Sequence, residues 1–189
     1  FNKNFDGKCK KNEEILIAYV GSMSASYDLT SIIDAMVKIK DRHVKLLAMG
    51  DGALKETFAS YSKERGINAE FTGKLPYPQM IEHLKQCDIA VNPIHKGSAG
   101  SIINKVGDYA MAGLPVINTQ ECVEYRDLLA QYKAGINCEC ENVGDIVNAL
   151  KLLIDDVELR ATMGRNSLKL GIERFDRAIS YNEILELFK

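Results

Sequence analysis

Short apolar runs alternate with amphipathic segments along most of this chain. The run ILIAYVG at 15–21 is uninterrupted and closed by a glycine, a pattern typical of a strand that is buried on both faces of a sheet. Five comparable runs follow at 44–50, 69–73, 88–93, 114–118 and 135–140. The pattern therefore predicts six strands.

The segments between these runs have helical periodicity. Leu29, Ile32, Ile33, Met36 and Val37 fall at i, i+3, i+4, i+7 and i+8, which places them on one face of a helix. Further helices are expected at about 53–65, 80–84, 101–112, 121–132, 143–154, 156–171 and 175–188. Strands that alternate with helices in this way predict an α/β fold, a doubly wound parallel six-stranded Rossmann-like sheet with helices on both faces.

This topology restricts where a ligand can bind. Ligands of doubly wound sheets bind outside the carboxyl ends of the strands, near the point where the strand order reverses. The candidates for a site are therefore the residues that come just after positions 21, 50, 73, 93 and 118.

The composition argues against several classes of partner. The net charge of −2 provides no broad basic surface for nucleic acid or anionic lipid. No apolar run approaches the ~20 residues of a membrane span. The cysteines are scattered and odd in number, which argues against a disulfide framework and favours a reducing cytoplasm.

Several well-known motifs do not occur in the sequence. The loop GSMSASYD at 21–28 lacks the G-x-G-x-x-G spacing of dinucleotide-binding proteins, and the chain has no Walker loop. His43, His83 and His95 match no metal-binding motif, and no carboxylate cluster offers a site, so no metal is predicted. Of the three histidines, His95 alone follows a strand end.

The segment HKGSAGSIINKVGD, which follows the fourth strand, suits a phosphate ligand. Gly97 and Gly100 let backbone approach a ligand, and Ser101 is expected to cap a helix whose free N–H groups can hold an anion. Lys105 adds a positive charge for a diphosphate, and Asp108, on the same helix face, can accept two ribose hydroxyl hydrogens. The alternative is an exposed ion pair between the two, worth at most about 1 kcal/mol.

Four segments, which together cover nearly the whole chain, resemble those of one family. They are YVGSMSASYDL, LLAMGDGALKE, FTGKLPYPQMIEHLKQCDIAVNP and NKVGDYAMAGLPVI. The chain resembles the C-terminal, donor-binding half of the retaining GT-B glycosyltransferases of group 1, also called family 4. The last segment is the most specific, because it matches a variant in which an Asn-Lys pair precedes an acidic residue, a Tyr, a small-residue run and Gly-x-Pro-Val.

The resemblance implies roles for particular residues. Asp108 stands where the family has the second acid of its Glu-x7-Glu motif, which holds the nucleotide ribose, and Gly100 replaces the first acid. Ser22 and Tyr27 stand where many members have an Arg and a Lys on the donor diphosphate. Lys105 is therefore expected to supply this charge.

The resemblance also implies the full set of site residues. Those predicted to bind the nucleotide sugar, including the loop that lies along the base in the family, are Gly21, Ser22, Lys74, Leu75, Gly100, Ser101, Asn104, Lys105 and Asp108. Lys105 is also the predicted catalytic residue. No cofactor or metal is expected besides the donor itself, a UDP- or GDP-linked sugar that is a substrate.

The family builds its active site between two domains, of which one is expected here. Residues 1–13 are interpreted as a linker at the edge of the chain, and 14–174 as the nucleotide-sugar-binding domain. Residues 175–189 are expected to form a helix that crosses to an N-terminal acceptor domain outside this chain. That domain would bind a sugar or lipid-linked saccharide acceptor. A cytoplasmic location is expected, and peripheral association with the inner face of the cell membrane is left open.

The implied reaction is transfer of a sugar from a nucleotide diphosphate donor to a hydroxyl, with retained anomeric configuration. The family's commonest setting is cell-surface polysaccharide or lipopolysaccharide biosynthesis, and this domain alone is expected to be inactive. Two alternatives remain open. One is a nucleotide-sugar epimerase of the same two-domain architecture, and the other is a non-catalytic α/β ligand-binding module.

Overall fold

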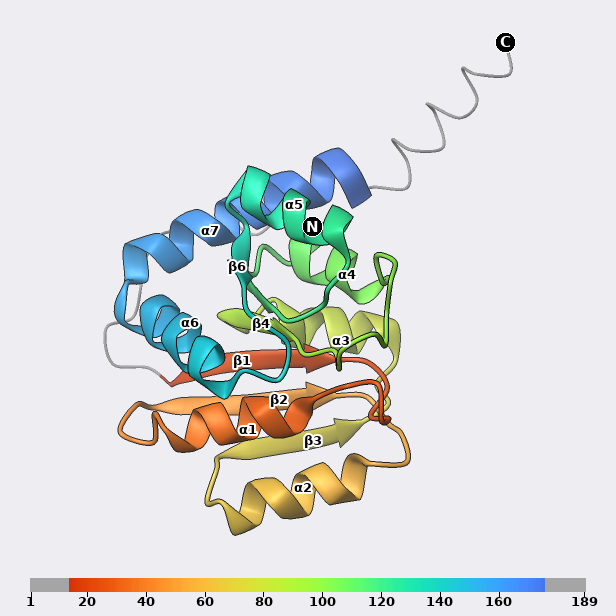
Figure 1. Cartoon of the computed structure of the whole chain (residues 1–189), viewed down its shortest axis with the longest axis vertical. Helices are drawn as coiled ribbons and strands as arrows, with labels where there is room; N and C mark the ends of the chain where they lie inside the picture. Colours follow the sequence, from red (N-terminus) through yellow and green to blue (C-terminus); the bar gives the residue numbers. More distant parts are fainter. Residues whose placement is uncertain (1–13, 176–189) are drawn as a thin grey trace.

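Six parallel strands lie in the order β3-β2-β1-β4-β5-β6 in the computed structural model, which describes residues 14–175 (Figure 1). The strands are β1 (Ile15–Val20), β2 (Val44–Met49), β3 (Ala69–Gly73), β4 (Ile89–Asn92), β5 (Val116–Asn118) and β6 (Gly135–Asn137). All neighbouring pairs run parallel, and the order reverses between β1 and β4. This is the doubly wound Rossmann-like sheet that the sequence predicted.

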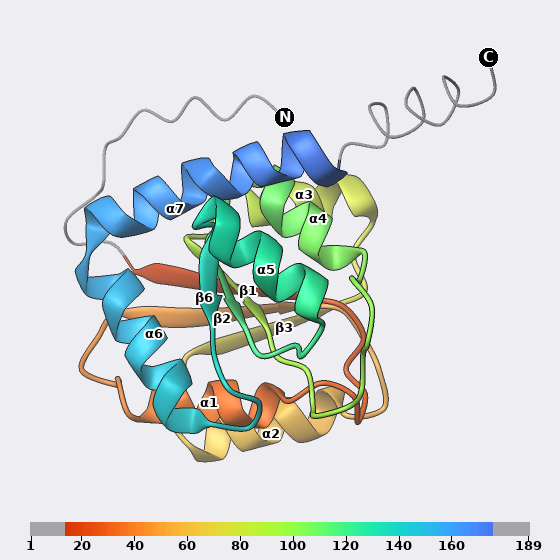
Figure 2. The ribbon, with the colours of Figure 1, turned by 45° about the horizontal axis from the view of Figure 1, so that its top comes forward.

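Helices cover both faces of this sheet (Figures 1 and 2). Three of them pack on one face: α1 (Leu29–Val37), α2 (Lys55–Glu64) and α6 (Val143–Asp155). Three pack on the other: α3 (Tyr77–Leu84), α4 (Lys105–Met111) and α5 (Val123–Tyr132). A further helix, α7 (Val157–Leu170), lies over α4 and α5 and continues into a turn of π-helix, η1 (Gly171–Phe175).

Burial on both faces explains why the strands have uninterrupted apolar sequences. In β1, Ile17 and Tyr19 pack into the hydrophobic cluster under α1 and α6, whereas Ala18 packs into the cluster under α3 and α4. All three side chains are fully buried. An alternating apolar and polar strand would leave polar groups in one of these two interfaces.

The structure corrects the predicted start of one helix. The expected helix at 101–112 begins instead at Lys105, with Asn104 at its N-cap position and no side-chain cap hydrogen bond. Ser101 is therefore not the cap. Its backbone carbonyl accepts a 2.6 Å hydrogen bond from Gln120 Nε2, which holds the segment before Asn104 as a loop. Strands β5 and β6 are also shorter than predicted.

Two predictions fall beyond the part of the chain that is described. The linker at 1–13 lies outside residues 14–175, and so does nearly all of the helix expected at 175–188. Their proposed roles stay predictions.

Candidate functional site

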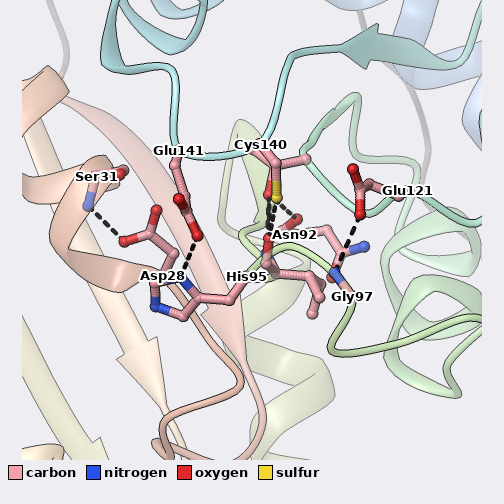
Figure 3. A network of polar contacts seen from close by, with 10 residues as sticks. Asp28, Ser31, Asn92, His95, Gly97, Glu121, Cys140 and Glu141 are labelled. Carbon is pink, nitrogen blue, oxygen red and sulfur yellow. Dashed lines mark hydrogen bonds and ion pairs between the residues drawn. The ribbon is translucent and has the colours of Figure 1, made fainter.

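The loops that follow β1, β4 and β6 meet at the carboxyl edge of the sheet (Figure 3). The backbone N–H of Asp28 donates to the Pro93 carbonyl at 3.3 Å, and the N–H of His95 donates to the Ser26 carbonyl at 3.1 Å. His95 Nδ1 also lies 2.9 Å from a Glu141 carboxylate oxygen, and this hydrogen bond lowers the pKa of Glu141 below its usual value. The loops on either side of the strand-order reversal are thus held together.

Two glycines lie where the loop after β1 meets the loop after β2. Gly21 has φ +135°, and its N–H donates to the Met49 carbonyl at 3.0 Å. A Cβ placed on Gly50, in the loop after β2, would lie 1.8 Å from the Gly21 carbonyl oxygen. Only glycine at position 50 allows the loops after β1 and β2 to approach so closely.

Lys105, on the first turn of α4, lies against this first loop. Its side chain is buried, with 8% exposed, and its Nζ is 4.4 Å from the ring centroid of Tyr19 and 4.2 Å from that of Tyr27. A Cβ on Gly21 would lie 3.6 Å from the same Nζ. Within residues 14–175 this Nζ has no hydrogen-bond partner, and burial lowers the pKa of Lys105 well below its ordinary value.

This placement excludes one of the two interpretations of the Lys105–Asp108 spacing. A buried amine cannot be half of an exposed ion pair, so that alternative is excluded. The sequence suggested that Lys105 compensates for the basic residues that Ser22 and Tyr27 replace in the first loop. The structure brings the Lys105 amine to that loop, directly over the Tyr27 ring.

Asp108 projects toward a different loop. Its carboxylate accepts a 2.9 Å hydrogen bond from the hydroxyl of Tyr77, which is the first residue of α3 and is 59% exposed. Tyr77 closely follows Lys74 and Leu75, which were predicted to lie along the base. Asp108 is only partly buried. Its hydrogen bond to Tyr77 places its carboxylate between α4 and the loop that follows β3.

The glycine-containing loop between β4 and α4 is held by a residue that the sequence analysis did not select. Gln120 is fully buried, and its Nε2 donates to the carbonyls of Ala99 at 3.2 Å and Ser101 at 2.6 Å. Its Oε1 accepts from Asn92 Nδ2 at 3.1 Å. Gln120 therefore fixes the backbone that precedes the first turn of α4.

A ladder of amide side chains supports Gln120 from the strand ends. Asn92, Asn118 and Asn137 end β4, β5 and β6 in register, and 2.9 Å hydrogen bonds join each to the next. A signal for this ladder was present in the sequence, since each Asn ends a short apolar run.

A cavity of about 340 Å³ lies beside this loop. Its lining residues are His95, Gly97, Ala99, Gly100, Glu121, Cys122, Val123 and Glu124. The carboxylate of Glu121 accepts a 3.0 Å hydrogen bond from the backbone N–H of Gly97, so this loop is tied to the next one along the sheet edge (Figure 3). Gly100 is the one predicted site residue in the lining.

The structure brings part of the predicted set together. Gly21 and Lys105 are in contact range, and Gly100 and Ser101 belong to the loop just before α4. The side chains of Ser22, Lys74 and Asn104 are exposed. Their roles in binding stay predictions.

Two further observations concern metals and membranes. Among the described residues, no group of three or more His, Cys, Asp or Glu side chains could hold a metal ion. The helices between residues 14 and 175 are all too short or too polar to span a bilayer.

The fold and the site define an α/β protein with a buried lysine at the carboxyl edge of its sheet, against the loop after β1. Residues 1–170 match the sequence family of glycosyl transferases group 1. The chain belongs to this family of glycosyltransferases. No curated protein sequence gives a significant match.

Solved GT-B glycosyltransferases share the fold. The complex of Anabaena Alr3699/HepE with UDP-glucose has a TM-score of 0.79 at 16% identity, over 93% of this chain and 48% of that one. The catalytic domain of the Helicobacter pylori cholesterol-α-glucosyltransferase has 0.73 at 20% identity, over 85% and 98%. WaaG, a glycosyltransferase involved in lipopolysaccharide biosynthesis, has 0.72 at 19% identity, over 87% and 44%. The chain thus spans less than half of two of these three proteins.

Proposed function

We propose that this chain is the donor-binding domain of a retaining glycosyltransferase and binds the diphosphate of a nucleotide sugar beside Gly21. The observation that carries this proposal is the position of Lys105. Its amine is held at the first loop, at the carboxyl end of β1 and next to the reversal of strand order. That is where anionic ligands bind in doubly wound sheets.

The proposed chemistry follows from where charge develops. Negative charge builds on the leaving diphosphate as the bond to the sugar breaks, and a cation placed there stabilises the transition state more than the ground state. Lys105 is the proposed source of this charge, and Asp108 is proposed to accept hydrogen bonds from the ribose. The acceptor would be a sugar or lipid-linked saccharide that is bound mainly by a second domain. No metal step is proposed.

The donor is proposed to carry UDP or GDP. The Anabaena protein in the comparison binds UDP-glucose, which supports a nucleotide sugar of this type. The structural likeness to WaaG, which is involved in lipopolysaccharide biosynthesis, supports a proposed role in polysaccharide or lipopolysaccharide assembly. A cytoplasmic location at or near the membrane is proposed with it.

A thermal-shift panel tests donor binding directly. UDP-glucose and GDP-mannose, each well above its Kd, should raise the melting temperature of the chain if they bind the native state, because stability rises by RT ln(1 + [L]/Kd). No shift with either ligand would contradict the proposed donor class. Product analysis of the complete gene product with radiolabelled donor, with and without acceptor, then separates transfer from epimerisation and from binding alone.

A further inference from the structure

The amine of Lys105 lies in an unusual environment for a phosphate-binding group. Phosphate-binding lysines are normally hydrated or paired, since a charged ammonium loses much solvation on burial. Here the side chain is 8% exposed, and Nζ contacts the rings of Tyr19 and Tyr27 instead of an oxygen. In the part of the chain that is described, this Nζ makes no hydrogen bond.

Within residues 14–175, the groups that face Lys105 offer it no compensating negative charge. From β1 it meets the Tyr19 phenol, whose pKa is raised by burial, so this hydroxyl stays neutral. From the loop after β1 it meets Tyr27, and the nearby Asp28 carboxylate is used to cap α1 through Ser31 N at 3.0 Å.

The neighbours of Lys105 on α4 itself also provide no free negative charge within the described residues. Tyr109 is fully buried and its pKa is also raised by burial, so it is neutral as well. Asp108, one turn along, accepts a hydrogen bond from Tyr77. Burial without a counter-charge favours the uncharged form of a lysine.

We propose that Lys105 is a neutral amine in the free protein and takes up one proton from solvent when the diphosphate of a nucleotide sugar binds beside Gly21. This inference rests on the proposed function, since it needs a diphosphate at that position. Nζ is enclosed in the free protein, and Gly21 has no side chain that would block a shift of the Lys105 side chain toward phosphate oxygens. Their negative charge then restores the ammonium, which supplies the charge-assisted hydrogen bond.

The coupling has a defined sign. Binding raises the pKa of Lys105 from its lowered value in the free protein, so binding takes up a proton at any pH between the two pKa values. Within this range the affinity for the ligand falls as the pH rises, by up to about tenfold per pH unit. Below this pH range Lys105 is already charged in the free protein, so its protonation no longer makes the affinity depend on pH.

Calorimetry of the 189-residue chain tests this proposal. UDP-glucose and GDP-mannose are titrated at about pH 8 in buffers of different ionisation enthalpy, which gives the number of protons bound. Sugar esters are used because a terminal phosphate monoester itself titrates near pH 6. The expected result is uptake of about one proton. In Lys105→Met, affinity should fall at least tenfold and the remaining binding should show no proton uptake. The control Lys63→Met, at an exposed position of α2, should retain the uptake.

The outcomes separate this proposal from the proposed function. Binding without proton uptake, or uptake that persists in Lys105→Met, overturns the neutral-amine proposal and leaves donor binding intact. Absence of binding by either nucleotide sugar contradicts the donor class instead. A measurement without ligand tests the neutral-amine proposal in that case. The ¹³Cε NMR signal of Lys105 is identified by its absence from the spectrum of Lys105→Met, and it should titrate at a clearly lower pH than the signals of exposed lysines. Titration at the same pH as those lysines overturns the proposal.

Discussion

The hydroxyl of Tyr77 donates a 2.9 Å hydrogen bond to the carboxylate of Asp108 and thereby joins the start of α3 to α4. This contact places the proposed ribose-binding acid at the loop after β3, whereas Lys105, on the same helix, reaches the loop after β1. One short helix thus connects two loops of the carboxyl edge, which are the loops expected to meet the two ends of a nucleoside diphosphate.

Asp108→Ala is expected to weaken binding of UDP or GDP by about tenfold or more, because hydrogen bonds from a ligand to a charged group contribute about 1.5–3 kcal/mol each. Binding of inorganic pyrophosphate, which has no ribose, should change little. Calorimetry with both ligands measures the difference. A matched control is Tyr77→Phe, which keeps the ring and the carboxylate. Equal weakening of nucleotide and pyrophosphate would show that Asp108 does not contact the ribose.

Lys105→Met is expected to stabilise the free protein by more than about 1 kcal/mol at pH 7. It replaces a buried amine, which has no hydrogen-bond partner within residues 14–175, with an apolar side chain of similar length. Urea unfolding at about pH 7 measures this change. The expected result is a stability gain that accompanies a loss of donor binding, as is common at functional sites.

The same variant has an expected pH dependence. The pKa of Lys105 is lower in the folded protein than in the unfolded chain, so the unfolded chain binds more protons between these two values. The free energy of unfolding of the wild-type protein therefore increases as the pH rises across this window. The difference in stability between Lys105→Met and the wild type should become smaller. Urea titrations from about pH 7 to pH 9.5 test this. An advantage that stays constant would mean that Lys105 is charged in both states.

Gln120→Glu is expected to lower the free energy of unfolding by about 2–4 kcal/mol at neutral pH, because it places a carboxylate against the Ala99 and Ser101 carbonyls without a donor. The loss should become smaller at acid pH, where the protonated carboxyl can donate one hydrogen bond. Gln131→Glu, at an exposed position of the neighbouring helix, is the matched control and should change little. Similar stability of both variants would contradict the proposed anchoring of this loop.

Gly50→Ala is expected to destabilise the protein by more than about 2 kcal/mol, since the new Cβ would overlap the Gly21 carbonyl oxygen and the position has φ +151°. Gly100→Ala is the control, because a Cβ there would meet nothing within 4 Å. It should change the free energy of unfolding by less than about 0.5 kcal/mol. Thermal unfolding of the two variants compares them. A tolerated Gly50→Ala would show that the two loops can separate.

The strands were predictable because each is buried on both faces. Ile17, Ala18 and Tyr19 are consecutive and fully buried, so the hydrophobic run marks the strand whatever its neighbours are. Right-handed crossovers then put helices on both faces of a parallel sheet, and the carboxyl ends of its strands mark the edge where ligands are expected.

The start of α4 was not predictable by the same means. A serine before an apolar helix is a local capping signal, but Gln120, 19 residues further along the chain, holds the Ser101 carbonyl in a loop. The environment of Lys105 was hidden for a similar reason. Its spacing from Asp108 gives the helix face, whereas the two tyrosine rings around its amine come from β1 and the loop after it.

A crystal structure of the chain with the sugar nucleotide that raises its melting temperature most would test the central claim directly. The account predicts the diphosphate beside Gly21, with a phosphate oxygen about 2.7–2.9 Å from the Lys105 amine and the ribose hydroxyls at Asp108. A nucleotide bound elsewhere, with Lys105 still enclosed by Tyr19 and Tyr27, would contradict it.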